Sequence, residues 1–451
     1  MPVVMWFRRD LRCQDNAALA AAAAAGEVAP LFVLDPRLWD PAGPARRAYL
    51  LRSLRELDRS VGGHLVVRRG DPAVEVPALA HAIAADQVHR AADYGPYGRE
   101  RDGAVDASLS EAGVDAVRTG SPYAVAPGRV LKSDGSPYAV FTPFYRAWLA
   151  HGWRKPAELS VPLRWAEVER PPLNEVLDAE PGDLPATLPD AGEAAALAMW
   201  RVYREEHLSD YDSDRNRPDL ATTSRLSVHL KYGEIHPRTL LADLAQRRGK
   251  AVDAYRRQLC WREFFADVLW HQPHTAREYL KPEMARLEYD TGGVADRQLR
   301  AWQEGRTGYP FVDAGMRQLL GEGYVHNRVR LAVASFLCKD LHLDWRLGAR
   351  YFMNRLVDGD LASNNQSWQW VAGSGVDAAP YYRVFNPVLQ GQRFDPDGDY
   401  VRRWLPELRG VVGGAVHEPW DLPGGVPEGY PERIVDHKVE REEALRRYAA
   451  R

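Results

Sequence analysis

Four stretches of the sequence hold residue types that bind ligands or carry out chemistry in other proteins. Residues 222–227 (TTSRLS) place hydroxyl groups in a row after Pro218, where they can cap a helix or bind an anion together with backbone N–H groups. On the next stretch an amide, an indole, a guanidinium and a phenyl ring share one helix face, because their positions follow i, i+3, i+4 and i+7 spacing: Gln258, Trp261, Arg262 and Phe265. Gln and Arg are seldom buried together without partners, so this face predicts a polar ligand site.

The other two stretches lie in the last third of the chain. Residues 326–331 (HNRVRL) place Asn327, Arg330 and Leu331 on one helix surface, with Arg328 turned away from it. Residues 358–370 (DGDLASNNQSWQW) combine two carboxylates, two amides and two indoles. The DGD start resembles a calcium loop, but the later glutamate and glycine spacing of such a loop is missing, so no metal site is expected. HExxH, GxSxG and paired-cysteine motifs are also absent, which argues against hydrolase chemistry.

Composition excludes several classes of protein. The 451 residues are 45% hydrophobic and 27% charged, which is typical of a globular protein with more than one domain. No apolar run approaches the ~18 residues of a membrane helix, and the N-terminus (MPVVMWFRRDLR) lacks the order of a signal peptide. Three widely separated cysteines predict neither disulfides nor a metal site, so we expect a cytoplasmic protein. The net charge of −3 means that any nucleic-acid surface must be a local arginine patch.

The elements that position these residues differ along the chain. In residues 1–130, apolar runs at 3–7, 28–34, 64–68 and 88–92 alternate with helical patterns at 16–25, 46–59 and 74–85. This alternation predicts a doubly wound α/β parallel-sheet domain that binds ligands beyond the carboxyl ends of its strands, although no GxGxxG follows the first strand. Residues 131–190, which become proline-rich from about residue 155, predict a linker. Residues 191–451 have helical periodicity almost throughout and predict an all-α C-terminal domain.

Taken together, the motifs resemble those of the photolyase/cryptochrome family. TSRLS, LCWREFF, AWQEGRTGYPFVDAGMRQL, HNRVR, DGDLASNNQSWQW and PYYRVFNPVLQGQRFD are similar to its helical flavin-binding half, and WFRRDLR with DNAAL is similar to its antenna domain. Within the family the chain looks most like a bacterial class I cyclobutane pyrimidine dimer photolyase. The resemblance implies a monomer that acts on UV-damaged DNA, in which excited, reduced FAD passes one electron to a flipped-out pyrimidine dimer.

The resemblance also implies roles for individual residues. Asn364 would face flavin N5, and Arg330 would pair with Asp358 beside the ring system. The residues implied to bind FAD are Tyr211, Thr223, Ser224, Arg225, Leu226, Ser227, Arg262, Arg330, Asp358, Asp360 and Asn364. Gln258 and Asn327 would contact the polar edges of the flipped-out lesion, and Trp261 and Trp370 would stack against it. The residues implied to approach the DNA backbone are Arg215, Arg328 and Arg383.

Three positions depart from the pattern of dimer-repairing relatives. Gln258 stands where those relatives usually carry glutamate, and Leu331 where they carry methionine. Gln is familiar at the first position from (6-4) photolyases, but their histidines are replaced here by Asn327 and Leu331. Of the family's three relay tryptophans, Trp368 and Trp345 match the first two, while the third position reads Glu288-Tyr289, with Tyr289 as a candidate substitute.

These departures keep other functions open. A cryptochrome-like blue-light photoreceptor without repair is the main alternative, since Gln258, Leu331 and the missing third tryptophan all suggest it. Repair of (6-4) lesions rests on Gln258 alone. A light-independent flavin oxidoreductase would need a nicotinamide site, and no motif in the sequence encodes one.

An antenna pigment is a separate prediction. Residues 94–102 (YGPYGRERD) resemble the relatives that use a deazaflavin (8-HDF) or FMN, and the glutamate typical of folate-binding relatives is missing around Gly98. The polar candidates for this site are Asp10, Asp35, Arg46 and Arg99. The alternative is a domain that keeps its fold as a scaffold without a pigment.

Overall fold

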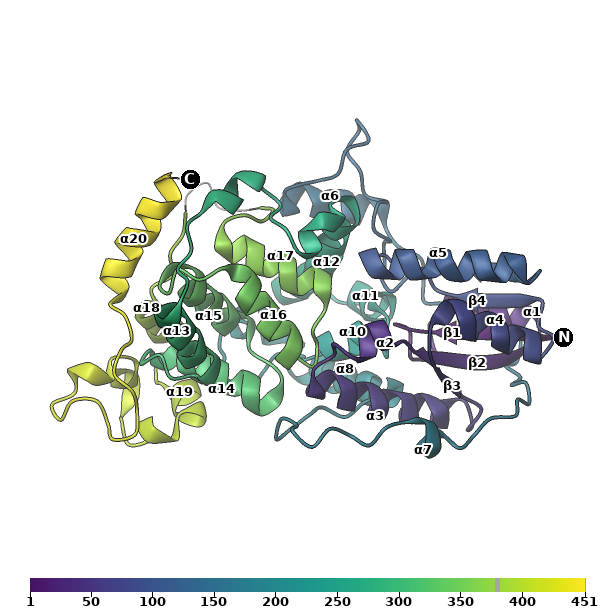
Figure 1. The fold of residues 1–451 in the computed structure, drawn as a ribbon, viewed down its shortest axis with the longest axis horizontal. Coiled ribbons are helices and arrows are strands. Elements are labelled where there is room, and N and C mark those ends of the chain that lie inside the picture. The colour runs from purple at the N-terminus through teal and green to yellow at the C-terminus, as the bar shows by residue number, and fades with distance from the viewer. Residues whose placement is uncertain (378–381, 451) are drawn as a thin grey trace. The chain divides into compact units, whose positions relative to one another are not determined.

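The computed structural model describes residues 1–377 and 382–450, which form two compact units (Figure 1). Unit 1 comprises residues 1–184, 189–209 and 224–273, and unit 2 comprises residues 185–188, 210–223 and the chain from 274 onward. This division follows backbone contacts and groups residues 224–273 with the sheet. The predicted boundaries at residues 130 and 190 rest on changes in hydrophobic periodicity and proline content along the sequence, and they stay a prediction.

The sheet of unit 1 has five parallel strands in the order β3-β2-β1-β4-β5, which confirms the predicted fold class. Four strands lie at the predicted apolar runs: β1 (Pro2–Phe7), β2 (Glu27–Leu34), β3 (Val66–Arg69) and β4 (Gln87–Arg90). The fifth, β5 (Asp115–Arg118), was not among them. It is an edge strand whose residues are mainly exposed and include Asp115 and Arg118, so it lacks the apolar run that marks a buried strand.

Helices cover the sheet as a doubly wound fold requires. The predicted helical patterns correspond to α1 (Ala17–Ala25), α3 (Pro44–Ser60) and α4 (Pro72–Ala82), and α5 (Pro96–Glu111) follows β4. One sheet face, which includes Val4 and Trp6, packs on apolar residues of α4 and α5. Because the strand order reverses between β1 and β4, a crevice for ligands is expected beyond the carboxyl ends of these two strands.

The rest of unit 1 is helical. Short helices α2 (Pro36–Trp39) and α7 (Leu173–Val176) lie in connections. Helix α6 (Phe141–His151) lies inside the segment predicted as a linker, because Phe141, Phe144 and Trp148 follow helical spacing and are buried. The remaining helices are α8 (Glu193–Glu206), α10 (Ser227–Tyr232), α11 (Pro237–Ala245) and α12 (Lys250–His271).

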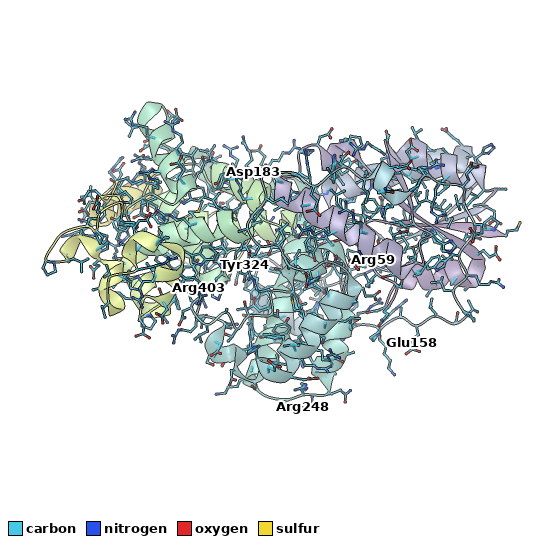
Figure 2. The ribbon with its side chains drawn as sticks, turned by 90° about the horizontal axis from the view of Figure 1, so that it is seen from below. Arg59, Glu158, Asp183, Arg248, Tyr324 and Arg403 are labelled. Atoms are coloured by element: carbon cyan, nitrogen blue, oxygen red, sulfur yellow. The ribbon has the colours of Figure 1, made fainter. Side chains whose placement is uncertain are left out.

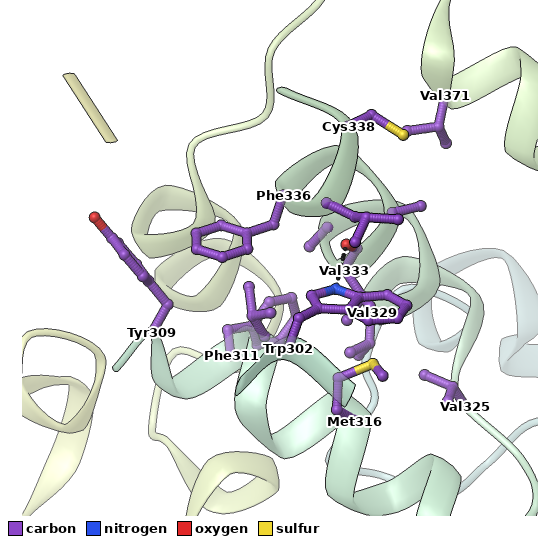
Figure 3. Close-up of a cluster of buried hydrophobic side chains, with 14 of the residues drawn as sticks. Trp302, Tyr309, Phe311, Met316, Val325, Val329, Val333, Phe336, Cys338 and Val371 are labelled. Atoms are coloured by element: carbon purple, nitrogen blue, oxygen red, sulfur yellow. Dashed lines mark hydrogen bonds between the residues drawn. The ribbon is translucent and has the colours of Figure 1, made fainter. Parts of the chain in front are cut away.

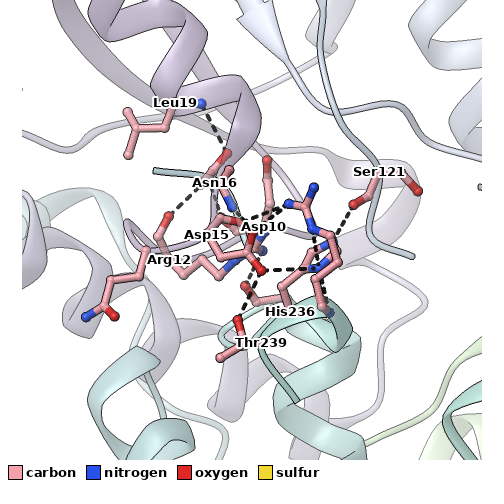
Figure 4. A network of polar contacts seen from close by, with 12 residues as sticks. Asp10, Arg12, Asp15, Asn16, Leu19, Ser121, His236 and Thr239 are labelled. Atoms are coloured by element: carbon pink, nitrogen blue, oxygen red, sulfur yellow. Dashed lines mark hydrogen bonds and ion pairs between the residues drawn. The ribbon is translucent and has the colours of Figure 1, made fainter. Parts of the chain in front are cut away.

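A buried polar network joins residues that follow β1 to the start of α11 (Figure 4). Asp15 accepts hydrogen bonds from Arg238 (Nη2 to Oδ1, 2.6 Å) and from Thr239 (Oγ1 to Oδ2, 3.0 Å), and Nε2 of His236 lies 2.8 Å from the Ser121 carbonyl oxygen. Burial and the nearby Arg12, Arg238 and Arg262 hold the pKa of His236 well below its usual value, so this ring is neutral. The network holds segments more than 100 residues apart in one arrangement.

Unit 2 is helical in the part that the structure describes. Its core helices are α13 (Gly293–Glu304), α14 (Pro310–Glu322), α15 (Asn327–Lys339), α16 (Trp345–Arg355) and α17 (Leu361–Ala372). Trp302 is completely buried in their hydrophobic cluster and donates its indole N–H to the Val333 carbonyl oxygen (3.1 Å; Figure 3). The other helices of this unit are α9 (Tyr211–Asp214), α18 (Pro387–Phe394), α19 (Asp399–Trp404) and α20 (His437–Ala450).

None of the helices in residues 1–377 and 382–450 combines the length and the apolar character that a transmembrane span requires.

A buried carboxylate attaches α20 to the end of α15 and makes stability depend on pH. Oδ1 of Asp340 lies 2.5 Å from Nδ1 of His437, and burial raises the pKa of Asp340 from 3.8 to about 6. The folded protein therefore binds an extra proton between about pH 4 and pH 6, so the unfolding free energy falls as pH rises through this window. Asp340→Asn stays uncharged and is expected to remove about 2 kcal/mol of that fall.

Urea unfolding at about pH 4 and about pH 7 measures this effect. The exposed Asp296 on α13 is the matched control, and Asp296→Asn is expected to keep the wild-type pH dependence. Equal pH profiles for Asp340→Asn and the wild type would show that Asp340 is not the titrating group.

Candidate cofactor and nucleic-acid site

The predicted polar face of α12 is partly open to solvent. Gln258 is exposed, and Trp261, Arg262 and Phe265 are half-buried, whereas the residues between them are buried. The four residues with i, i+3, i+4, i+7 spacing are thus less buried than their neighbours, and binding of a ligand by this face stays a prediction.

The hydroxyl-rich loop ahead of α10 is held against α12 within unit 1. Tyr255 donates its hydroxyl hydrogen to Oγ of Ser224 (2.9 Å), and Arg262 donates from Nη2 to the Leu230 carbonyl oxygen (3.0 Å). Arg225 adopts a left-handed conformation with φ of 50°, a strained backbone that is common at binding sites. Of the predicted residues here, Leu226 is buried, whereas Arg225 and Ser227 are exposed.

Arg262 is anchored to the protein by its guanidinium. Nη1 donates to the Pro122 carbonyl oxygen (3.1 Å), and the group also lies over the Tyr123 ring at 4.6 Å. These contacts orient the side chain, and its planar fork has five N–H donors, so two bonds to carbonyl oxygens leave others for a ligand.

Trp261 stacks face to face on Phe141. Their ring centroids are 3.7 Å apart with an interplanar angle of 7°, and Phe264 and Phe265 touch Trp261 at 5.7 and 5.3 Å. Phe141 itself is buried at the start of α6. One face of the indole is thus supported by the protein while the side chain stays half-exposed, which suits it to stack a flat ligand.

In unit 2, Arg330 and Asp358 form an ion pair. Nη2 of Arg330 lies 3.2 Å from Oδ2 of Asp358, and Nε donates to the Val325 carbonyl oxygen (2.7 Å). The guanidinium also lies 5.4 Å from the ring of Tyr324, a residue marked in Figure 2. The Asp358 side chain is only 5% exposed, so Arg330 is its partner in a largely buried ion pair.

The start of α17 places two further predicted residues one turn apart. Asp360 caps the helix by accepting from the Ser363 N–H (3.0 Å). The buried amide of Asn364 donates from Nδ2 to the Ala349 carbonyl oxygen (3.1 Å) and to Oδ1 of Asn365 (2.8 Å). With its N–H groups used in this way, the amide is oriented with its oxygen as the acceptor for a ligand.

The start of α15 carries the predicted nucleic-acid residues. Asn327 is exposed, and Leu331 is half-buried one turn further along the same face. Arg328 donates from Nε to Oδ1 of Asn216 (2.7 Å), and the Arg215 guanidinium lies 5.9 Å from the Tyr211 ring. The two arginines are thus oriented by neighbours within unit 2, and contact of these residues with DNA stays a prediction.

Three predicted tryptophans and one arginine differ in exposure. Trp345 and Trp368 are buried in the same hydrophobic cluster of unit 2. Trp370 is half-buried and donates from Nε1 to the Asp377 carbonyl oxygen (3.1 Å). Arg383 is exposed.

The antenna candidates lie in unit 1 and are two buried aspartates and two arginines. Asp10 and Asp35 are buried after the carboxyl ends of β1 and β2, where Tyr97 donates its hydroxyl hydrogen to Asp35. Burial raises the pKa of Asp10, whose Oδ2 has no hydrogen-bond partner among the described residues. Arg99 instead lies over the Trp270 ring at 4.0 Å, and burial lowers the pKa of the half-buried Arg46.

Gly98 packs closely against Asp93. A Cβ atom at position 98 would lie 2.3 Å from Cγ of Asp93, so a larger residue would require the Asp93 side chain to move. Asp93 is held in place by Arg101 (3.1 Å). Burial alone would raise its pKa, but Arg9, Arg101 and Arg8 together hold it at about 2.

Sequence reasoning missed the residues that position the predicted ones. Tyr255 precedes Gln258 by one turn of α12, so extending the helical spacing backward would have found it. Phe141 beneath Trp261, Asn216 beside Arg328 and Tyr279 beside Trp345 have no such signal, because each comes from a distant part of the chain.

Comparison with known proteins covers both halves of the chain. The family model for DNA photolyase matches residues 3–162, and the model for the FAD binding domain of DNA photolyase matches residues 255–450. The deoxyribodipyrimidine photo-lyase of Streptomyces griseus is 42% identical over 96% of each chain. That of Halobacterium salinarum is 40% identical over 98% of each chain.

Solved structures agree with these relatives. A class III photolyase from Agrobacterium tumefaciens has a TM-score of 0.89 at 37% identity, covering 100% of this chain and 97% of the other. An archaeal photolyase from Sulfolobus tokodaii with two FAD molecules has a TM-score of 0.84 at 29% identity over the full length of both chains. A Synechocystis cryptochrome has a TM-score of 0.87 at 29% identity over 99% of both chains.

Proposed function

This chain belongs to the DNA photolyase family, and we propose that it is a deoxyribodipyrimidine photo-lyase that uses light to repair cyclobutane pyrimidine dimers in DNA. The observation that carries the proposal is similarity along nearly the whole chain to proteins with that name. Assignment to class I within the family stays a prediction, as do a monomeric state and a cytoplasmic location.

The residues present fit FAD as the cofactor. Oγ1 of Thr222 is buried and has no hydrogen-bond partner in the described part of the chain, as expected for a hydroxyl that meets a bound group. The neighbouring loop adds hydroxyl and backbone donors suited to phosphates. We infer, from the family resemblance, that the FAD-binding residues are Tyr211, Thr223, Ser224, Arg225, Leu226, Ser227, Arg262, Arg330, Asp358, Asp360 and Asn364.

The chemistry that FAD supplies when bound is the transfer of one electron to the dimer and its return. The protein orients the groups around that exchange. The ion-paired Arg330 adds a fixed charge-assisted donor, and the amide of Asn364, held at its nitrogen, offers an uncharged acceptor in a buried place.

Lesion binding is assigned to amides and indoles. Extruding the dimer from the duplex costs a few kcal/mol, and the cost is lowest for a damaged, poorly paired site. Gln258 and Asn327 offer exposed amides for the polar edges of the bases, and Trp261 and Trp370 offer rings for stacking. Arg215, Arg328 and Arg383 supply phosphate contacts, so affinity for DNA is expected to fall with added salt.

Removing the stacking indole is expected to weaken lesion binding. Stacking of one base on an aromatic side chain contributes ~1–3 kcal/mol, so Trp261→Ala should raise the dissociation constant for dimer-containing DNA by roughly 5- to 150-fold. Fluorescence anisotropy with a labelled oligonucleotide measures it. Trp165→Ala, a half-buried tryptophan of unit 1 outside α12, is the control and should bind as the wild type does. Equal affinities for both variants would contradict a lesion-stacking role.

The repair reaction itself distinguishes the two leading functions. Chemically reduced protein is mixed with an oligonucleotide that contains a thymine dimer and is illuminated, and restored thymine absorbance is expected. A cryptochrome-like photoreceptor, which similarity to the Synechocystis cryptochrome favours, would restore none. Gln258→Glu serves as the second variant: a gain in yield would show that the amide limits an existing repair activity.

A second pigment is the finer part of this proposal. We infer a flavin or deazaflavin (FMN or 8-HDF) beyond the carboxyl ends of β1 and β2, beside the buried Asp10 and Asp35. Its support is the orphaned Asp10 oxygen and the presence of two FAD molecules in the Sulfolobus photolyase. Arg46 and Arg99 remain candidates. The absorption spectrum of protein purified from its own host, followed by chromatography of the released pigments, tests it.

A further inference from the structure

We propose that the C-terminal helix α20 positions Arg383 for contact with the DNA backbone, and that Tyr448 of this helix is the positioning residue, acting through the ring of Tyr382. The inference rests on the proposed function, in which Arg383 is a phosphate contact. It adds α20 and Tyr448, to which neither the motifs nor the comparisons assign a role. All of these residues belong to unit 2.

Tyr448 stacks on Tyr382. Their ring centroids are 4.0 Å apart and the interplanar angle is 13°. Tyr448 is half-buried, and Tyr382 is only 9% exposed. Because two stacked rings exclude water from the faces that they share, removal of the Tyr448 ring would uncover one face of Tyr382. Tyr382 directly precedes Arg383, so this contact lies one residue from the arginine.

A buried lysine holds both the Tyr382 ring and the backbone of Arg383. Nζ of Lys339, the last residue of α15, lies 4.2 Å from the centre of the Tyr382 ring and donates a hydrogen bond to the Arg383 carbonyl oxygen. Lys339 is 2% exposed, and burial lowers its pKa to about 8, so it is charged at neutral pH. A buried ammonium depends on such partners, so a shift of the ring would also disturb the bond to Arg383.

The neighbours of Arg383 are fixed as well. A Cβ atom at Gly373, the residue that ends α17, would lie 2.9 Å from Cε2 of Tyr382, so the ring packs directly on the end of this helix. Phe385 donates its backbone N–H to Oγ of the buried Ser335 (3.2 Å). The exposed Arg383 side chain, whose guanidinium lies 6.0 Å from the Phe385 ring, therefore extends from a backbone held on both sides.

Polar pairs fix the rotation of α20 about its axis. Near the start of the helix, Oε2 of Glu440 lies 2.7 Å from Nε2 of His342. Near its end, Arg447 pairs with Asp290 at 2.7 Å. Glu440 and Arg447 are seven residues apart and lie on one helix face, and Tyr448 follows directly after Arg447. These two pairs therefore set the direction in which the Tyr448 ring points.

Core packing does not account for α20. Its buried residues are His437 and Ala444, and Val439 is 60% exposed. A helix that is kept for core packing buries a continuous apolar stripe, which α20 lacks. What α20 contributes to unit 2 is a set of polar pairs and a tyrosine ring beside the residue that precedes Arg383.

A positioned arginine acts on DNA binding through charge. One phosphate contact changes the slope of log affinity against log salt by ~0.9, which corresponds to roughly fivefold in affinity at about 0.15 M salt. Phosphate contacts carry no sequence information, so the effect should be equal for intact and dimer-containing DNA. This pattern differs from that of the stacking residue Trp261, whose loss should act mainly on damaged DNA.

Fluorescence anisotropy with labelled duplexes, measured on the FAD-loaded protein over a series of salt concentrations, tests the inference. Tyr448→Ala should weaken the binding of intact and dimer-containing DNA by the same factor, roughly fivefold, and lower the salt slope by ~0.9. Tyr448→Phe keeps the ring and should bind as the wild type does. The control is Tyr351→Ala, which removes a half-buried ring that contacts Trp302 and should keep the wild-type affinity and slope.

A double-mutant cycle links the tyrosine to the arginine. Arg383→Ala alone should lower affinity and salt slope as Tyr448→Ala does, and Tyr448→Ala should add nothing in the Arg383→Ala background, because both changes remove one contact. Additive losses would overturn the inference. Unchanged affinity and slope in Tyr448→Ala would also overturn it, as would equal losses in Tyr448→Ala and Tyr351→Ala.

Repair separates this inference from the proposed function. At saturating DNA, chemically reduced Tyr448→Ala should restore thymine as the wild type does, because positioning of Arg383 affects binding and not the electron transfer. A repair yield at saturating DNA that falls in Tyr448→Ala but not in Tyr448→Phe would contradict a role confined to binding. A wild type that binds DNA without repairing the dimer would instead contradict the proposed function, and the affinity comparison would still decide the role of Tyr448.

Discussion

Replacement of Glu263 by alanine is expected to lower the free energy of unfolding by about 4 kcal/mol. The side chain lies on α12 and is almost fully buried. Its carboxylate accepts hydrogen bonds from Trp148 Nε1 (2.7 Å) and from the backbone N–H groups of Val125 (3.0 Å) and Ala124. Alanine would leave two buried donors and one half-buried donor without a partner, and each buried donor costs ~1–3 kcal/mol.

Urea unfolding followed by circular dichroism measures the loss. Glu205→Ala removes a carboxylate of the same type that is 55% exposed and pairs with Arg204, so it should change stability by no more than ~0.5 kcal/mol. Glu263→Gln keeps the side-chain volume and one acceptor oxygen. Its loss of unfolding free energy should lie between those of Glu263→Ala and Glu205→Ala. If all three variants unfold alike, the carboxylate does not organise the contacts of α12 with residues 124–148.

Loss of the Arg330 guanidinium is expected to release the cofactor. A charge-assisted hydrogen bond contributes ~1.5–3 kcal/mol, so Arg330→Ala should raise the dissociation constant for FAD by roughly 10- to 150-fold. The change also leaves the carboxylate of Asp358 buried without its counter-charge. Fluorescence titration of flavin-free protein with FAD gives the constant directly.

The neighbouring helix offers a matched arginine. Arg346 on α16 also pairs with an aspartate, at 2.6 Å, but its side chain is 42% exposed, so Arg346→Ala should bind FAD as the wild type does. Arg330→Lys keeps the charge without the fork and should recover part of the affinity. Equal FAD affinity in Arg330→Ala and Arg346→Ala would contradict a role of Arg330 in binding the cofactor.

The sequence by itself determined the features that depend on local periodicity and motif. Four buried strands, three helices of unit 1 and the partly open face of α12 follow from patterns that repeat every two residues or every 3.6 residues. The edge strand β5 was not predicted, because its exposed residues form no apolar pattern. The family followed from long ordered motifs, and the residues assigned to FAD and DNA stay predictions that rest on it.

Only the tertiary structure decided which distant residues support those positions. Phe141 stacks on Trp261 across 120 positions of sequence (261 − 141), and Glu263 binds donors more than 100 positions away. Tyr448 stacks on Tyr382 only through the packing of α20. The physical reason is that side-chain stacking and buried hydrogen bonds depend on which elements pack together, and this information lies in no single local pattern.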